Sequence, residues 1–515
     1  MCYEYFDRLY EKDPNWFNDY SNLNFDNFPQ GSQTTTNNIA FVMERLRVYE
    51  TCFVINRLDI SRYKITKYDT LDYRMFPFIN LTYLENDVKY HYDHTKSVWL
   101  VLLNANKVNK KKRGIVLSVG EDQVEDALRL INTLSATDFS LEMYYNDNDG
   151  NNNGLIPIQI VHKGDLSQSS IDLFKNLGGK LNKNDLDIEV INASNFISPQ
   201  YIGKFTTFLN KWLAVLFNTF DREFILLDAD VILFTNPYNF FNIQEYLDNG
   251  NLFFRDRSIM VDKLSQNCVD MFEAALPPPS QREAYFKSEK TIEYQVYKEF
   301  FHGGYLHQLE SGLVVINKQM HYFATVISTI LNLSNDIGEC AWGDKEYFWL
   351  GFLALGNNST HNYKFYPNEA SGVGEEIKQV YNRNVNIYDK RICSVQVGHT
   401  SYADPETHLL WLNGGAYNCK FHDNIKDLPE GITEEGDNSL GDSIIKINSY
   451  IIPDRTGVNF FRENWACNGY NWCARYYELD NVVHGEWGDF NPKEIEWINS
   501  ILRKWGEYPQ IMGIK

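Results

Sequence analysis

Long apolar segments are missing from this 515-residue sequence. No run of about eighteen consecutive apolar residues occurs, so the sequence predicts no helix that spans a membrane. The first residues, MCYEYFDRLYEKD, lack the basic start and apolar centre of a signal peptide. We therefore expect neither an anchor nor a signal within this chain.

Positive charge is also scarce. The chain has 48 Lys and Arg against 68 Asp and Glu, a net charge of −20, whereas proteins that bind nucleic acid present basic faces. The eight cysteines form no CxxC pair that would indicate a zinc site, so they are either buried thiols or disulfides. Together with five N-x-S/T sequons they favour a secretory lumen, where disulfides persist; the sequons stand at Asn80, Asn192, Asn332, Asn357 and Asn358.

Apolar residues make up 43% of the chain, enough for a full core, and the length predicts a large catalytic domain with attached segments. We expect an N-terminal helical segment over 1–105, with a helix capped near Asn38, then a catalytic domain over 106–424. An aromatic appendage follows over 425–515. In it Cys467 and Cys473, six positions apart, could form a small disulfide loop.

Apolar runs that alternate with helical patterns predict a parallel sheet. The run 114–119 reads as the first strand, Gly120 ends it, and 122–134 reads as the helix that crosses back. Further strands are expected over 156–162, 186–190 and 224–227. Nucleotides bind where the strands of such sheets end, so the backbone from Ser118 to Gly120 is a candidate for nucleotide contact.

Two acids follow the fourth of these strands. Asp228 and Asp230 are separated by Ala229 and flanked by the apolar runs 224–227 and 231–234. Along a strand, side chains i and i+2 point the same way, ~6–7 Å apart. Two like charges between apolar residues are costly unless a cation joins them, and a hard divalent cation with oxygen ligands fits. The alternative is that one Asp caps a turn while the other faces water.

Three further charged residues, Lys211, Glu310 and Asp344, stand on or beside predicted elements. Lys211 lies on the predicted helix 205–220, just ahead of the paired acids, and could equally be a surface lysine. Glu310 precedes a predicted strand; Ser311-Gly312 reads as a turn that lets backbone approach a sugar, although Glu310 could merely form a salt bridge. Asp344 stands where a helix begins, a position at which an acid often only caps the helix.

Histidine could complete a metal site. His399 follows a predicted strand at 392–397, and neutral imidazole is a good ligand for manganese-like ions. A lone histidine is otherwise structural. His408, a few residues further on, is a rival ligand.

Four stretches carry a resemblance to a known family. They are DAD in LDADVILFTNP, ESG in ESGLVVINK, GDKE in GDKEYFWLGF, and WLNGG, and they occur in that order over roughly 111–420. The set resembles fungal Golgi α-1,3-mannosyltransferases that extend N- and O-linked mannans. The segment TSYADPETHLL departs from the family pattern, which is why His408 competes with His399.

The resemblance implies a fold and a set of site residues. The fold is α/β, a GT-A type Rossmann-like mixed sheet flanked by helices. Catalytic or sugar-orienting roles fall on Asp344 and Glu310. Donor binding falls on Gly120, Lys211, Asp228, Ser311, Gly312 and Lys345. Metal binding, of Mn2+ or another divalent cation, falls on Asp228, Asp230 and His399.

The implied reaction is transfer of mannose from GDP-mannose to a mannose hydroxyl of a glycoprotein glycan, with retention of configuration. An α-1,3 linkage is expected first and an α-1,2 linkage second. The family works in the Golgi lumen behind an N-terminal membrane anchor, and that anchor is missing from this chain. An inactive relative that binds glycans, and a hexosyltransferase that uses UDP-sugars, remain open as alternatives.

Overall fold

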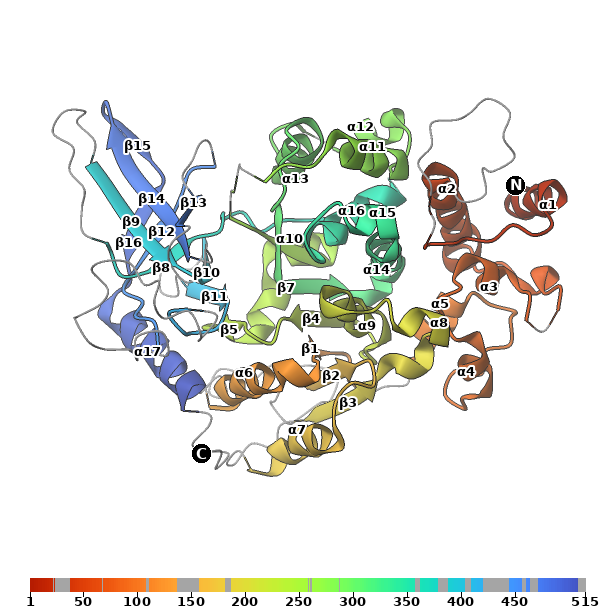
Figure 1. Ribbon diagram of the computed structural model, residues 1–515, viewed down its shortest axis with the longest axis horizontal. Helices are drawn as coiled ribbons and strands as arrows, with labels where there is room; N and C mark the ends of the chain where they lie inside the picture. Colours follow the sequence, from red (N-terminus) through yellow and green to blue (C-terminus); the bar gives the residue numbers. More distant parts are fainter. Residues whose placement is uncertain are drawn as a thin grey trace.

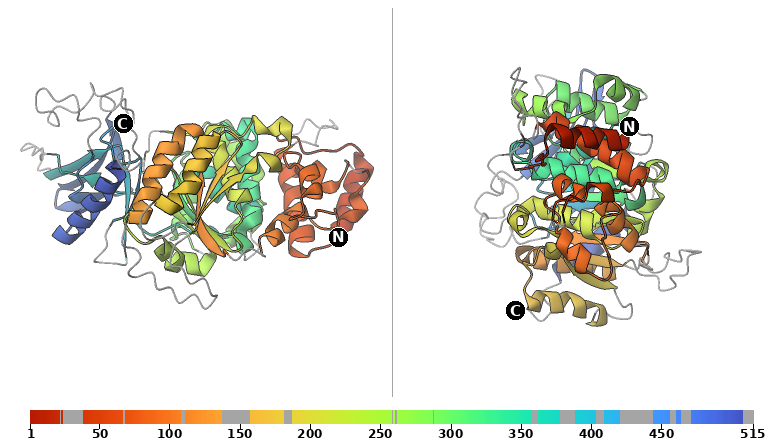
Figure 2. Two further views of the ribbon diagram at one scale, coloured as in Figure 1. Left: turned by 90° about the horizontal axis from the view of Figure 1, so that it is seen from below. Right: turned by 90° about the vertical axis from the view of Figure 1, so that its right-hand side faces the viewer.

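The computed structural model describes most of the chain. The described residues are 1–21, 23, 38–66, 68–107, 111–136, 157–180, 187–257, 259, 262–286, 288–356, 362–377, 388–402, 409–419, 444–455, 460–463 and 471–507. His408, Cys467 and the sequons at Asn357 and Asn358 lie outside them. N-terminal helices form one end of the molecule and C-terminal strands the other, with the central sheet between them (Figures 1 and 2).

The central sheet has six strands. Their order is β3 (Ile188–Asn192), β2 (Ile158–His162), β1 (Arg113–Ser118), β4 (Glu223–Leu227), β7 (Leu309–Asn317) and β6 (Asn251–Arg255). The first four strands are parallel, whereas β7 runs antiparallel to both β4 and β6. Strands buried on both faces read as continuous apolar runs, which is why β1 and β4 were predictable. The α/β class with a mixed sheet is confirmed.

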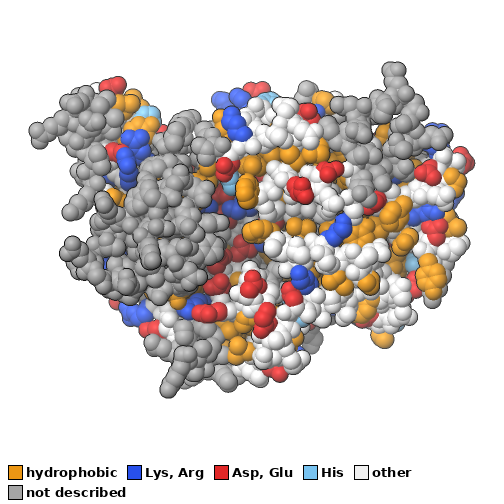
Figure 3. Space-filling view, viewed as in Figure 1, with side chains coloured by type: hydrophobic (Ala, Val, Ile, Leu, Met, Phe, Trp, Pro, Cys, Tyr) orange, Lys and Arg blue, Asp and Glu red, His pale blue; other side chains and the backbone are white. Residues whose placement is uncertain are grey.

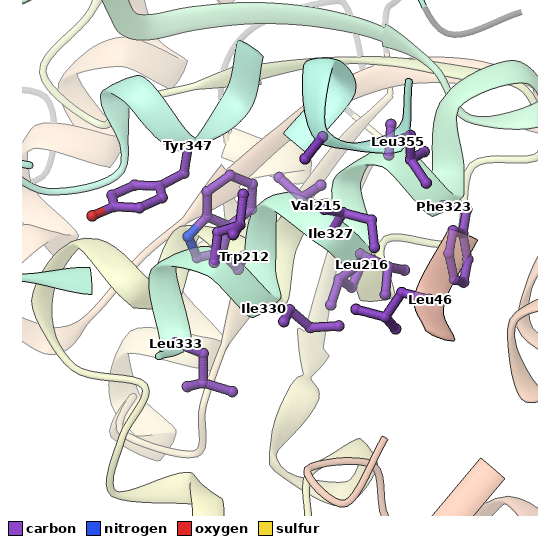
Figure 4. Packing of buried hydrophobic residues seen from close by; sticks show 14 of the residues in the cluster. Leu46, Trp212, Val215, Leu216, Phe323, Ile327, Ile330, Leu333, Tyr347 and Leu355 are labelled. Carbon is purple, nitrogen blue, oxygen red and sulfur yellow. The ribbon is translucent and has the colours of Figure 1, made fainter. Parts of the chain in front are cut away.

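Helices cover both faces of this sheet. On one face Ile115 and Leu117 of β1 share a core with α6 (Val124–Ala136) and α7 (Gln168–Lys180). On the other face Val116 shares a core with α9 (Asn210–Phe217), α14 (Lys318–Leu333) and α16 (Lys345–Leu355). In Figure 4 the side chains of α9, α14 and α16 meet there, with Leu46 beside them. This layer holds the two helix starts that carry Lys211 and Asp344.

The N-terminal segment is helical, as expected. It contains α1 (Cys2–Lys12), α2 (Ile39–Tyr49), α3 (Leu71–Met75), α4 (Leu81–Asn86) and α5 (Val98–Ala105), and a disulfide joins Cys2 to Cys52. The Asn38 side chain accepts from the Ala40 amide, so the predicted cap of α2 is confirmed. Arg47 of α2 donates to the Ala275 and Ala354 carbonyls, which ties the segment to the catalytic layer.

Strands from both sides of the expected boundary at 424/425 pair with each other. β8 (Gly372–Gly374) pairs with β12 (Ser449–Ile452), which pairs with β16 (Glu486–Asp489). β9 (Tyr388–Ser394) pairs with β14 (Asn471–Leu479), whose neighbours are β13 (Phe460–Glu463) and β15 (Val482–His484). A third sheet joins β10 (Val397–Thr400), β11 (Leu409–Asn413) and β5 (Ile232–Leu233). The final helix, α17 (Pro492–Gly506), packs on α6, where Arg129 donates to the Trp505 carbonyl.

One expectation about a disulfide is wrong, and one of the sequons is buried. Cys473 faces Cys393 across β14 and β9 and forms a disulfide with it, so the small loop with Cys467 does not form. Asn332 is buried and hydrogen-bonded inside the helical layer, which makes its sequon unusable in the folded protein. Both depend on long-range packing, which local spacing does not reveal.

No helix among the described ranges combines the length and apolar character needed to cross a membrane.

Candidate active site

The paired acids lie at the carboxyl edge of the parallel strands. Asp228 directly follows β4, and its amide donates to the Gly312 carbonyl of β7 at 2.9 Å. The register pairs Leu117 of β1 with Leu227 of β4, so Ser118 and Gly120 continue from β1 at the same edge. Gly120 and Asp228, two of the predicted donor-binding residues, therefore follow neighbouring strands at the same edge of the sheet.

Lys211 is the centre of the site. Its Nζ lies 2.8 Å from Asp228 Oδ1 and 2.7 Å from Asp344 Oδ2, and it donates to Ser311 Oγ at 3.1 Å. The lysine is buried and is not the surface residue of the alternative reading. Segments more than 100 positions apart in sequence thus meet at one ammonium group.

The charges around Lys211 do not balance. Burial raises the pKa of Asp228 to about 6; the Asp344 and Asp230 carboxylates add to the rise, and Lys211 opposes it. Burial alone would lower the pKa of Lys211, but Asp228 and Asp344 outweigh it and raise that pKa. The Asp228 side chain is 27% exposed and the Asp344 side chain 2%. The site therefore holds a permanent cation and an excess of negative charge that solvent reaches through Asp228.

A second group of charges lies beside the first. Lys345 Nζ is 2.7 Å from Asp256 Oδ2 and 3.1 Å from Glu310 Oε2. Glu310 Oε1 accepts from Asn413 Nδ2 at 2.9 Å and from the Gly312 amide at 3.1 Å. Both carboxylate oxygens of Glu310 are thus engaged, and its orientation is fixed from two directions.

Asp256 was not singled out from the sequence. It follows β6 and is fully buried. Burial would raise its pKa, but Lys345 and Arg257 lower that pKa well below the usual range. The pairing of β6 with β7 and the packing of α16 on β7 together bring it beside Lys345, and no local pattern indicates either contact.

The start of α16 joins the two groups. Asp344 occupies the position before the first turn but makes no capping hydrogen bond with its side chain. Its carboxylate pairs with Lys211 instead, while the next residue, Lys345, pairs with Glu310. Capping alone therefore does not account for Asp344.

The Glu310-Ser311-Gly312 segment is a strand, not a turn. β7 begins at Leu309, because pairing with β6 and β4 extends it beyond the apolar run. A Cβ on Gly312 would lie 2.8 Å from Asn413 Nδ2 and 3.1 Å from Trp411 Cζ3. Glycine is thus needed for the close approach of β11, which lets Asn413 reach Glu310.

Asn332 positions both helix starts and was missed. Trp212 Nε1 donates to Asn332 Oδ1 at 2.7 Å, and Asn332 Nδ2 donates to the Gly343 carbonyl at 3.1 Å. These bonds link the residue after Lys211 with the residue before Asp344. The only sequence signal at Asn332 was its sequon, which pointed to a different role.

His399 is buried and stacks on Trp411, with ring centroids 4.1 Å apart. Neither ring nitrogen has a hydrogen-bond partner among the described residues. Burial lowers the pKa of His399 to about 3, and the charged groups that modify this effect are Asp256, Lys345 and Arg257. The imidazole is therefore neutral at physiological pH, as a metal ligand requires.

The described residues fit a divalent cation in part. Asp228 and Asp230 repel each other, which a cation would relieve, and the orphaned nitrogens of His399 suit a metal of manganese type. Within the described ranges, however, no three acidic, histidine or cysteine side chains converge on one point, so His399 is not gathered with the two acids. Acidic side chains gather near the middle of the face in Figure 3.

Sequence comparison assigns this site to a class of enzyme. Residues 112–401, more than half of the chain, match the family described as "Mannosyltransferase putative". The chain belongs to this family and is a glycosyltransferase. The matched range includes both charge groups of the site.

Two Saccharomyces cerevisiae proteins are similar over nearly the whole chain. Alpha-1,3-mannosyltransferase MNT3 is 29% identical over 98% of this chain and 82% of the relative. Alpha-1,3-mannosyltransferase MNT2 is 27% identical over 93% of this chain and 87% of the relative. Alpha-1,3-mannosyltransferase MNN1 of the same organism is 30% identical over 81% of this chain and 58% of the relative.

Solved structures are similar only at a low level. The mannosyltransferase Ktr4p from S. cerevisiae, in complex with GDP, aligns with a TM-score of 0.30 and 14% identity over 65% of this chain and 80% of that chain. The glycosyltransferase GlyE of Streptococcus pneumoniae aligns with a TM-score of 0.29 and 14% identity over 50% and 45%. The family assignment therefore rests on sequence alone.

Proposed function

We propose that the protein transfers mannose from GDP-mannose to a mannose hydroxyl at the end of a glycoprotein glycan and forms an α-1,3 link with retention of configuration. The observation that carries this proposal is the Lys211 cluster at the carboxyl edge of the sheet, inside the range that matches the mannosyltransferase family. Three S. cerevisiae relatives named alpha-1,3-mannosyltransferases support the choice of linkage.

Asp228 and Asp230 would hold a divalent cation, Mn2+ or a similar ion, with His399 as the proposed third ligand. Such an ion, when bound, neutralises charge on a leaving diphosphate. Lys211 keeps its charge between Asp228 and Asp344 and offers a second, fixed positive group to the donor. An acidic enzyme needs such local positive charge to bind an anionic nucleotide sugar.

Asp344 and Glu310 would orient the transferred sugar, with Ser311, Gly312 and Lys345 lining its place and Gly120 facing the nucleotide. In the proposed step the bond from the anomeric carbon to the phosphate oxygen breaks, and a bond to the acceptor oxygen forms on the same face of the sugar. The acceptor proton passes to the departing phosphate oxygen. No side chain then needs to act as the base.

We place the reaction in the Golgi lumen. The disulfides Cys2–Cys52, Cys268–Cys340 and Cys393–Cys473 support an oxidising compartment, because such bonds are rare in the cytosol.

The test is incubation of the protein with GDP-mannose, Mn2+ and a panel of mannobioses, with GDP release measured and the product linkage read by NMR. We expect an α-1,3 product whose formation is lost in Asp230→Ala and kept in Asp248→Ala, an exposed acid on α10 (Gln244–Asn249). An α-1,2 product would show that the proposed linkage is wrong, although the proposed mannosyl transfer would remain.

Two other results would overturn the function itself. Equal GDP release by Asp230→Ala would exclude cation-assisted transfer at this site. Protection against heat by UDP but not by GDP would indicate a different donor.

A further inference from the structure

Two large aromatic side chains stand exposed beside the Lys211 cluster. Trp342 is 71% exposed and Phe208 is 59% exposed, although most aromatic rings of the described chain lie in the core. Leaving such rings in water forgoes the free energy of burying them, about 2–3 kcal/mol each. Grouped exposed rings mark ligand-binding surfaces more often than scattered ones do.

The two rings lie at the same place. Phe208 belongs to a short turn, Thr207–Leu209, that leads into α9, three positions before Lys211. Trp342 stands two positions before Asp344, whose Oδ2 is 2.7 Å from Lys211 Nζ. The Lys211–Asp344 ion pair therefore fixes the distance between the two chain segments.

Gly343 brings these segments into contact. A Cβ on Gly343 would lie 3.1 Å from Cγ of Phe208, so the backbone next to Trp342 packs directly against the Phe208 ring. Gly343 has φ +68°, which favours glycine, and its carbonyl accepts from Asn332. The base of Trp342 is thereby held in place while its ring stays in solvent.

The turn that presents Phe208 is strained. Thr207, a β-branched residue, has φ +47°, a region that costs such a residue about 1–3 kcal/mol. This cost is not offset by full burial, because Phe208 stays 59% exposed even though one part of its ring packs on Gly343. A strained turn that holds a ring outward, next to a catalytic cluster, is typical of a ligand contact.

The two rings stand on segments that pack on opposite sides of β4: Phe208 leads into α9, which packs against β1 and β2. Gly120 continues β1, which flanks β4 on one side. Trp342 leads into α16, which packs against β7, the strand that flanks β4 on the other side. Trp342 therefore stands on the side of β4 opposite Gly120, two positions before Asp344.

We infer that Trp342 and Phe208 form a subsite for a hexose ring of the acceptor glycan, next to the mannose that receives the transferred sugar. This inference rests on the proposed function. A pyranose ring has an apolar face of C–H groups that packs on an aromatic ring while its hydroxyls stay in water. The subsite would make longer mannose chains better acceptors than a single mannose.

The experiment compares acceptors of two lengths with purified full-length variants. Trp342→Ala and Phe208→Ala should raise KM for mannotriose about tenfold. They should leave KM for methyl mannoside and for GDP-mannose within about twofold. Trp342→Phe should recover most of the loss, because it keeps a ring, and Tyr68→Ala, an equally exposed ring in the N-terminal segment, serves as the matched control.

Several outcomes overturn the subsite. One is an unchanged KM for mannotriose in both alanine variants. Another is a raised KM for GDP-mannose, which would indicate that the rings contact the nucleobase of the donor. A third is a change in sedimentation from dimer in the wild type to monomer in the alanine variants, which would indicate that the rings contact a second copy of the chain.

Binding of mannotriose alone, followed by saturation-transfer NMR, separates this inference from the proposed function. If the wild type transfers no mannose but binds mannotriose, and Trp342→Ala does not bind it, the subsite is supported and the proposed function is wrong. Absence of both transfer and binding in the wild type overturns both.

Discussion

Two buried charge clusters of this protein differ in how their charges balance. Around Lys211, one ammonium group faces the carboxylates of Asp228 and Asp344, and Asp230 is close enough to raise the pKa of Asp228 further. This cluster reaches solvent through Asp228.

In the other cluster the ion pairs join equal numbers of cations and carboxylates. Arg455 lies 2.7 Å from Glu299 and 2.6 Å from Glu369, and Arg255 lies 3.2 Å from Glu299 and 3.8 Å from Glu369. Two guanidinium groups face two carboxylates, and Gln308 accepts from both arginines. The cluster fastens the segment before residue 455 to the catalytic sheet.

The difference separates a structural cluster from a functional one. Buried charges that only hold a fold together are paired, because an uncompensated charge is costly away from water. A cluster left with excess charge at an open edge keeps a place for a ligand of the opposite charge. Two substitutions test this distinction and a third tests an isolated buried charge, beginning with the largest expected effect.

Asp344→Asn should lower kcat/KM for mannosyl transfer about 100- to 1000-fold, because it removes charge from the unbalanced cluster while keeping the shape of the side chain. Steady-state kinetics with GDP-mannose measures this. The control is Asp389→Asn, which removes a buried carboxylate that pairs with Arg391 and Arg475 in the C-terminal sheet. If kcat/KM falls as far in the control as in Asp344→Asn, the Lys211 cluster is no more functional than a structural ion pair.

Arg455→Met should lower the free energy of unfolding by about 3 kcal/mol, because it leaves Glu299 and Glu369 with one cation between them. Urea denaturation measures this effect. The kcat/KM of the folded variant should stay within about threefold of the wild type. A strong loss of rate without a loss of stability would place this cluster in the catalytic machinery.

Lys318→Met tests a single charge that no ligand reaches. Lys318 is buried and donates to the Asn218 carbonyl at 2.6 Å; burial lowers its pKa to about 7, Lys89 adds to this, and Asp221 opposes it. Between pH 7 and about 10.5 the unfolded lysine binds a proton that the folded one releases, so its cost to stability falls as pH rises.

The methionine variant should therefore be more stable than the wild type at pH 7, by about 1–2 kcal/mol after loss of the hydrogen bond. This gap should narrow toward pH 10, as measured by urea midpoints. A gap that stays constant with pH would mean that the lysine remains charged when buried.

Much of the sheet could be predicted from sequence. β1 and β4 are continuous apolar runs ended by Gly120 and Asp228, and that pattern is local. The strand predicted to follow Glu310 begins earlier, at Leu309, because the first residues of β7 pair with β6. The pairing of β9 with β14 was not predicted, since nothing near either strand indicates a partner about 80 residues away.

The site residues also divide into those that the sequence predicted and those that it did not. Asp228 was selected because it is one of two acids between apolar runs, and Lys211 and Asp344 by resemblance to a family. The structure brings all three together, although their roles remain predictions. Asp256 carries no local pattern, and the only pattern at Asn332, its sequon, does not indicate a place in the site. They join the site because strands and helices distant in sequence pack there, which spacing along the chain does not encode.

The pairing of strands across residue 424 has a practical consequence for shortened versions of the protein. A version that stops there would keep β8 and β9 but lose β12 and β14, so two strand edges would be left with unpaired amides and carbonyls. Bare edges of this kind recruit other chains. It would also leave Cys393 a reactive thiol. A version of the enzyme made for experiments should therefore extend to the end of α17, because a shorter one is expected to aggregate.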